Sequence, residues 1–74
     1  MIEDELMEIL KESYEVNPEL LNSNSLLREH LDSIDFLGFL LDVKKKYRID
    51  IEPEEIKNLQ TIEQIADAVR KLKS

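Results

Sequence analysis

Glycine and proline are nearly absent from this chain, and their scarcity limits the folds open to it. The 74 residues include one glycine and two prolines. Because these residues form most tight turns and interrupt helices, so few of them indicate a mostly helical chain. A chain of this length has room for three or four helices around a thin core, and we expect one domain over residues 1–74.

Apolar residues recur at helical spacing near both ends of the chain. The first helix is predicted from Ile2 to Tyr14, with a buried face formed by Ile2, Leu6, Ile9, Leu10 and Ser13. The last helix begins at Thr61-Ile62-Glu63-Gln64, a capping-box pattern. Its common face is formed by Ile62, Ile65, Ala66, Val69 and Leu72. Both helices are therefore expected to bury one face against the rest of the chain.

A long connection, residues 15–32, follows the first helix. Asn17-Pro18 and Asn22-Ser23-Asn24-Ser25 favour turns. Between the turns lie five leucines, Leu20, Leu21, Leu26, Leu27 and Leu31. We expect these leucines to hold the connection against the core. Long connections without regular structure are uncommon in small domains and are often functional.

The middle of the chain predicts two further helices. The second begins at Asp32 or Ser33 and ends near Tyr47, since Asp32 is a good N-cap. An extended apolar link, residues 48–51, leads to a short third helix from Pro53 to about Leu59, because proline suits the first helical position. The predicted fold class is all-α.

The second helix has two apolar faces. A core-facing stripe is formed by Phe36, Phe39, Leu40, Val43 and Tyr47. The opposite side is formed by Ile34, Leu37, Gly38, Leu41 and Lys45. Residues 15–31 either cover this second face or leave it open as a docking surface for a partner enzyme. Gly38 would then allow a partner to approach closely.

Composition and charge exclude several classes of function. The chain has no cysteine, so disulfides, thiolate metal sites and a cysteine nucleophile are excluded. Its net charge is −7, and residues 1–35, with ten acids and two bases, account for −8 of it. This acidity argues against nucleic acid as the main partner. The same charge is also explained if the acids only keep a small domain soluble. An acidic N-terminus and the lack of a membrane-length apolar stretch lead us to expect a cytoplasmic protein.

One serine stands out, in Asp32-Ser33-Ile34-Asp35-Phe36. It lies where the polar connection gives way to the second helix, with acids on both sides. The single histidine, His30, could form a catalytic pair with Ser33, but the sequence suggests neither a third group to orient it nor an oxyanion hole. We therefore interpret His30 as a loop residue. Ser33 is therefore expected to be modified rather than to catalyse. The other serines, Ser13, Ser23, Ser25 and Ser74, lack this setting.

Asp32-Ser33-Ile34-Asp35 resembles the Asp-Ser-Leu-(Asp/Glu) signature of the acyl carrier protein family. The order of elements over the whole chain is similar to that family as well. The resemblance implies a four-helix bundle with three longer helices, one short helix and a long first loop. It also implies that a phosphopantetheinyl transferase attaches 4'-phosphopantetheine from coenzyme A to Ser33. Asp32 and Asp35 would help the transferase and its metal-bound coenzyme A to find the serine.

The resemblance further implies a carrier and not an enzyme. The thiol of the arm would hold an acyl group as a thioester and carry it between a loading ligase and synthase enzymes of fatty-acid, polyketide or related specialised biosynthesis. Ile34, Leu37 and Leu41 match positions that contact such partners, and Lys45 extends that docking set. Two alternatives remain: a stand-alone peptidyl or aminoacyl carrier, including the D-alanyl type, and a helical interaction module without a prosthetic group. We expect a monomer, with no metal site, no nucleic acid and no membrane among its partners.

The chain departs from the family pattern at several positions. His30 stands where the family usually has glycine, and Gly38 where an acid is common. Lys44-Lys45-Lys46 replaces an acidic run, which either changes the choice of partner or only complements the helix dipole. Phe36 and Phe39 would leave less room for a long cargo. We therefore expect a cargo that is short, polar or aminoacyl, or one that stays outside the core.

Overall fold

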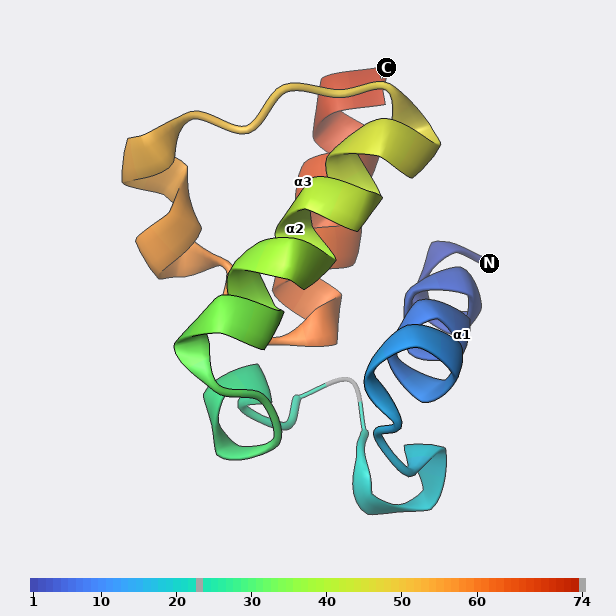
Figure 1. Ribbon diagram of the computed structural model, residues 1–74. Helices are drawn as coiled ribbons and strands as arrows, with labels where there is room; N and C mark the ends of the chain where they lie inside the picture. The colour runs from blue at the N-terminus through green and yellow to red at the C-terminus, as the bar shows by residue number, and fades with distance from the viewer. Residues whose placement is uncertain (23, 74) are drawn as a thin grey trace.

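The computed structural model describes residues 1–22 and 24–73, and throughout these residues the chain is helical without strands. Three α-helices, α1 (Ile2–Tyr14), α2 (Ser33–Tyr47) and α3 (Ile62–Lys73), form the body of the fold (Figure 1). Three short 3₁₀ helices, η1 (Pro18–Leu20), η2 (Leu27–Glu29) and η3 (Pro53–Asn58), lie in the connections. The predicted all-α bundle of three longer helices and one short helix is confirmed. The short helix, η3, is a 3₁₀ helix.

The helix boundaries follow from local capping. Asp32 precedes α2 with extended backbone, and its Oδ1 accepts a hydrogen bond from the Asp35 amide at 2.8 Å. Before α3, Thr61 Oγ1 accepts from the Gln64 amide at 3.1 Å, while Gln64 Oε1 accepts from the Thr61 amide at 3.2 Å. This is the reciprocal capping box that the sequence predicts.

The core lies where α1, α2 and α3 face one another. Its fully buried side chains are Leu6, Leu10, Leu27, Phe39, Val43, Ile62, Ile65, Ala66 and Val69. The predicted faces of α1 and α3 are largely confirmed, with two exceptions. Ser13 is exposed because Tyr14 packs at the last turn of α1, where a small hydroxyl would gain little from burial. Leu72 is 40% exposed and lines a hollow between α3 and η3 instead of the core.

The long connection is held on the core, as the sequence predicts. Four side chains of this connection are buried in the core: Val16, Leu21, Leu27 and Leu31. The Leu27 amide also donates to the Gln60 carbonyl at 2.8 Å, which fixes η2 beside the start of α3. Leu20 is an exception, being 68% exposed at the end of η1. The predicted turn at residues 22–25 includes Ser23, which lies outside the described residues, as does Ser74.

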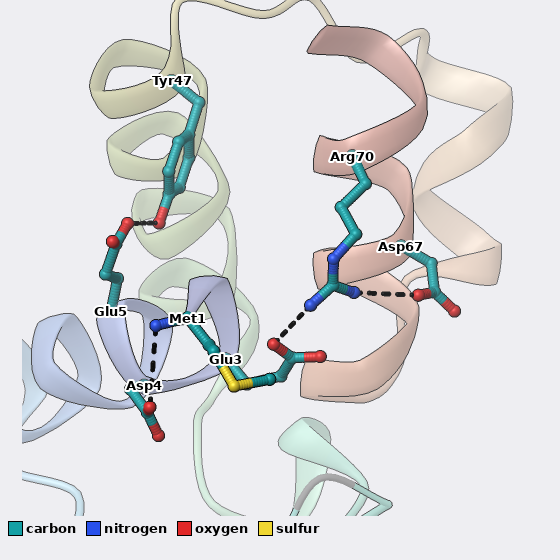
Figure 2. A network of polar contacts seen from close by, with 7 residues as sticks. All are labelled: Met1, Glu3, Asp4, Glu5, Tyr47, Asp67 and Arg70. Carbon is teal, nitrogen blue, oxygen red and sulfur yellow. Dashed lines mark hydrogen bonds and ion pairs between the residues drawn. The ribbon is translucent and has the colours of Figure 1, made fainter. Parts of the chain in front are cut away.

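Polar contacts fasten the N-terminal half of α1 to the other two helices. Figure 2 shows the hydrogen bond from the hydroxyl of Tyr47, the last residue of α2, to the carboxylate of Glu5 in α1. It also shows Arg70 of α3 paired with both Glu3 and Asp67. The Tyr47 contact joins the C-terminal end of α2 to α1, and the Arg70–Glu3 pair joins α3 to α1, so Ser33 at the N-terminal end of α2 lies outside this network.

Candidate functional site

Ser33 is the first residue of α2 and its side chain is exposed. The Asp32 carboxylate caps the helix by accepting a hydrogen bond from the Asp35 amide, and it forms no hydrogen bond with the Ser33 hydroxyl. Within the described part of the chain, that hydroxyl has no hydrogen-bond partner. Ser33 is therefore open to an enzyme that modifies it, and its modification would break no hydrogen bond of the fold.

The charges around Ser33 act on an attached anionic group in opposite directions, favourably from the helix N-terminus and unfavourably from the two neighbouring carboxylates. A helix N-terminus carries partial positive charge, which favours an anionic group on a residue of the first turn. Asp32 and Asp35 are both exposed beside the serine. His30 is exposed at the end of η2, and no hydrogen bond joins it to Ser33. In residues 1–22 and 24–73, no group of three or more acidic or histidine side chains is arranged to hold a metal ion.

An apolar ridge extends along α2 from the turn that contains Ser33. Ile34 is 79% exposed, Leu37 51% and Leu41 54%, so the connection does not cover this face. Of the two possibilities left open by the sequence, the open surface is the one observed. Lys45 is exposed one turn beyond Leu41, at the far end of the ridge. The predicted docking residues therefore lie on one continuous exposed surface.

Gly38 faces α1 instead of a partner. A Cβ at this position would lie 2.9 Å from the Tyr14 hydroxyl oxygen. That hydroxyl donates to Asp42 at 2.7 Å, and the Tyr14 ring packs edge-on against Phe39. Burial, followed by this hydrogen bond, raises the pKa of Tyr14 to about 12. The interpretation of Gly38 as part of the docking surface is therefore wrong, because its missing side chain makes room for Tyr14.

Two other departures from the family pattern find a structural explanation. His30 has φ −117° and ψ −18°, a conformation open to any residue, so this path of the loop needs no glycine. At the end of α2, Lys44 lies 3.5 Å from Asp50, and Lys46 lies over the Tyr47 ring. Lys45 has neither an ion pair nor an aromatic contact in the described residues. It is therefore the lysine of this run that is free to meet a partner.

Two hollows lie along the side of α2 that faces η3. The first, of about 260 Å³, is lined by Arg28, Phe36, Ile56, Lys57 and Gln60. The second, of about 220 Å³, is lined by Leu37, Leu40, Leu41, Lys44, Ile51 and Ile56. Phe36 is only partly buried and forms a wall of the first hollow, whereas Phe39 is fully buried. The expectation that both phenylalanines fill the core therefore holds for Phe39 alone.

Sequence reasoning missed the remaining residues of the first hollow, Arg28, Ile56, Lys57 and Gln60. One signal was available in the sequence. Arg28 is one of two basic residues in the acidic stretch of residues 1–35, and it lies five positions before Ser33. The other three residues come from η3 and the link to α3, and only the fold brings them beside α2.

The chain is similar to a known protein family. The family described as the phosphopantetheine attachment site matches residues 4–69, which is nearly the whole chain and contains α2 and most of α1 and α3. No helix in the described residues has the length and apolar character needed to cross a membrane.

Proposed function

This chain belongs to the phosphopantetheine-binding carrier proteins, which are not catalysts but hold 4'-phosphopantetheine on a serine, and we propose that this serine is Ser33. Family membership sets aside the helical interaction module without a prosthetic group. One observation carries the choice of residue. Ser33 combines an exposed, unbonded hydroxyl with the first position of a capped helix.

The proposed modification uses few features of the chain. The Ser33 hydroxyl oxygen attacks the phosphorus of coenzyme A that bears the pantetheine. A new phosphate ester bond forms, the pyrophosphate bond breaks, and the adenosine bisphosphate leaves while the serine proton is lost. In the described residues no side chain accepts a hydrogen bond from the Ser33 hydroxyl, so the transferase must supply the proton acceptor and the metal. Asp32 and Asp35 would help to position its metal-bound substrate, and the N-terminal end of α2 favours the anionic product.

The proposed role is that of an acyl carrier for fatty-acid, polyketide or related specialised biosynthesis. The bound group supplies a thiol that holds the cargo as a thioester, on an arm flexible enough to reach successive active sites. The chain supplies the attachment point and the surface that partner enzymes recognise. The same proposal covers residues 1–74 as one carrier domain, acting as a monomer in the cytoplasm with a transferase, a loading ligase and synthase enzymes.

The apolar ridge of Ile34, Leu37 and Leu41 supports a docking role beside the proposed attachment point. Exposed leucine and isoleucine side chains in a row along one helix are unusual for a surface without a partner. Lys45 adds an unpaired positive charge at the far end, while Asp35 adds negative charge at the near end. A partner that fits this surface would therefore present an apolar strip with a basic end near Ser33 and an acidic end near Lys45.

A stand-alone aminoacyl carrier, including the D-alanyl type, is the alternative. It would share the attachment serine and differ in the cargo. The partly exposed Phe36 and the hollows outside the core favour a small cargo, which suits either carrier. The enzyme that loads the cargo separates the two, since aminoacyl loading requires an adenylating ligase for an amino acid.

Intact-protein mass spectrometry tests the attachment directly. The protein is incubated with coenzyme A, Mg²⁺ and a promiscuous phosphopantetheinyl transferase, and Ser33→Ala is treated in parallel. We expect the parent to gain one phosphopantetheine and the variant to gain none. Ser13→Ala is a matched control, since Ser13 is also an exposed serine on a helix, and it should be modified like the parent. Modification of Ser33→Ala would assign the arm to another residue.

A further inference from the structure

The first hollow lies beside the proposed attachment point. Phe36 follows Ser33 by three positions, so the two side chains are neighbours on the surface of α2. Phe36 forms a wall of this hollow, together with Arg28 of η2, Ile56 and Lys57 of η3, and Gln60. An arm attached to Ser33 therefore starts within about one helical turn, roughly 5 Å along the axis, of the hollow.

The lining combines an apolar floor with two cations. Phe36 and Ile56 are partly buried and pack against the core, while Arg28 and Lys57 are exposed at the rim. No acidic side chain lines the hollow. The lining therefore carries two positive charges and no negative charge, although the whole chain carries −7.

Neither cation is neutralised from within the fold. Among residues 1–22 and 24–73, Arg28 and Lys57 form no ion pair, even though the chain has 17 carboxylate side chains. Gln60 Nε2 donates one of its two hydrogens to the Lys57 carbonyl at 2.9 Å. The charged donors at the rim are the guanidinium of Arg28 and the ammonium of Lys57, and both suit an anionic oxygen group.

The neighbouring hollow gives a contrast within the same surface. It shares Ile56 with the first, but its other lining residues are aliphatic apart from Lys44, and Lys44 lies beside Asp50. Two hollows along one side of α2 therefore offer different chemistry. An anionic group is attracted by the two cations of the first hollow, whereas an alkyl group gains nothing from them.

We propose that the hollow of Arg28, Phe36, Ile56, Lys57 and Gln60 binds an anionic oxygen group presented by the arm on Ser33. Two parts of a loaded arm have this chemistry, the phosphodiester next to the serine and a carboxylate at the end of a short acyl cargo. The hollow has a volume of about 260 Å³ and is bordered by exposed side chains, so a small anionic group can enter it from the surface. This proposal rests on the proposed function and deepens it.

The proposal makes a statement about the class of cargo. A carboxylated acyl group would gain charge-assisted hydrogen bonds from Arg28 and Lys57. The ammonium group of an aminoacyl cargo would be repelled by both cations. Since both cations are exposed, the attraction is modest and weakens with salt. The hollow therefore favours an anionic acyl cargo over an aminoacyl one.

The test compares four forms of isotope-labelled protein by amide NMR. They are the unmodified protein and the forms made from coenzyme A, butyryl-coenzyme A and succinyl-coenzyme A. From each donor a promiscuous transferase moves the phosphopantetheine, with its acyl group where there is one, to the serine and releases adenosine bisphosphate. Intact mass verifies each form before the spectra are compared. We expect the amide signals of Arg28, Ile56, Lys57 and Gln60 to shift on modification. A shift between the unmodified and coenzyme A forms assigns the phosphodiester, and one between the butyryl and succinyl forms assigns the carboxylate.

Matched variants separate binding in the hollow from general charge effects. The pair Arg28→Gln and Lys57→Gln should each reduce the shift, and together they should reduce it by more than half. Lys45→Gln removes the same charge from an exposed site outside the hollow and should leave the shift unchanged. Raising the salt from about 0.05 M to about 0.5 M should weaken the shift in the parent.

Two outcomes overturn the proposal, and they are distinguishable. If mass shows full modification but these amides do not shift in any form, or shift equally in the double variant, the anion site is wrong and the proposed function stands. If mass shows no modification of the folded parent, while a known carrier is modified in the same tube, both proposals fall. An aminoacyl form made with glycyl-coenzyme A that shifts these signals as much as the succinyl form would contradict the preference for anionic cargo.

Discussion

The side of the molecule where α1, α2 and α3 meet differs sharply from the side formed by η3. On the packed side, Phe39 and Val43 are fully buried, and Tyr47 and Arg70 hold the helices through side-chain contacts with α1. On the η3 side, the short helix contains no buried residue. Three hollows each take part of their wall from residues 51–60, including a third between η3 and α3.

The difference shows how so small a chain divides two tasks. The packed side supplies the stability, since burial of apolar surface is the main favourable term in folding. The η3 side leaves space beside the first half of α2, where Ser33 lies. A carrier needs both, because α2 must be held firmly enough to present the serine while the surface beside it can still receive other groups.

The largest expected effect comes from comparing two substitutions to alanine, one on each side of the molecule. Phe39→Ala removes a fully buried ring from the packed side, and we expect a loss of about 3–5 kcal/mol in the free energy of unfolding. Ile56→Ala, on the side already hollowed, should cost only about 1 kcal/mol, because its side chain is partly exposed and borders existing space. Urea denaturation measures both. Equal losses would contradict the division into a packed and a hollow side.

A second test concerns the contact of Gly38 with Tyr14. Gly38→Ala should gain about 1 kcal/mol from helix propensity. In the parent, however, the new Cβ would push the Tyr14 hydroxyl away from Asp42 and lose a hydrogen bond of about the same worth, so little net change is expected. In a Tyr14→Phe background the same substitution should stabilise by the full amount of about 1 kcal/mol. Equal effects in the two backgrounds would show that the close contact carries no energy.

A smaller gain is expected at the end of α1. Glu15 follows this helix with φ 57° and ψ 27°, a left-handed conformation that disfavours side chains. Glu15→Gly should therefore stabilise the packed side by about 0.5–1 kcal/mol. Glu12→Gly, three residues earlier inside the helix, is the matched control and should destabilise by about 1 kcal/mol. The midpoint of thermal unfolding should rise for Glu15→Gly and fall for Glu12→Gly. A change of both midpoints in the same direction would contradict the argument from the φ angle of Glu15.

The smallest expected effect is on the pH dependence of the free energy of unfolding, through the pair of Glu3 and Arg70. The hydrogen bond from Arg70 is the main cause that lowers the pKa of Glu3 in the folded chain. Because the folded pKa lies below the unfolded one, this pair contributes stability above the unfolded value of about 4.5, and the contribution disappears as pH falls through the folded value. Glu3→Gln should therefore lose less stability than the parent between neutral pH and pH values below 4.5. Arg70→Gln removes the same hydrogen bond from its other partner and should reduce the pH dependence in the same way.

Much of the fold was open to prediction because its signals are local. The bounds of α1 and α2 follow from helical spacing and from the Asp32 cap, and the start of α3 follows from the Thr61–Gln64 box. Leucines at intervals in the connection were enough to predict that it is held on the core. Helical periodicity gave errors at Ser13 and Leu72, in the last turns of α1 and α3, while the errors at Phe36 and Gly38 concern how α2 packs against its neighbours.

The sequence by itself determined the helices, the acidic character of the first half and the serine at the start of α2, because caps and periodic burial act between residues close in the chain. Tertiary structure alone decided which face of α2 stays open, which neighbour Gly38 admits, and that Arg28 of η2 and Lys57 of η3 border one hollow beside Ser33. These arrangements depend on how separate helices pack, and no local pattern records the distance between two residues that lie far apart in the chain.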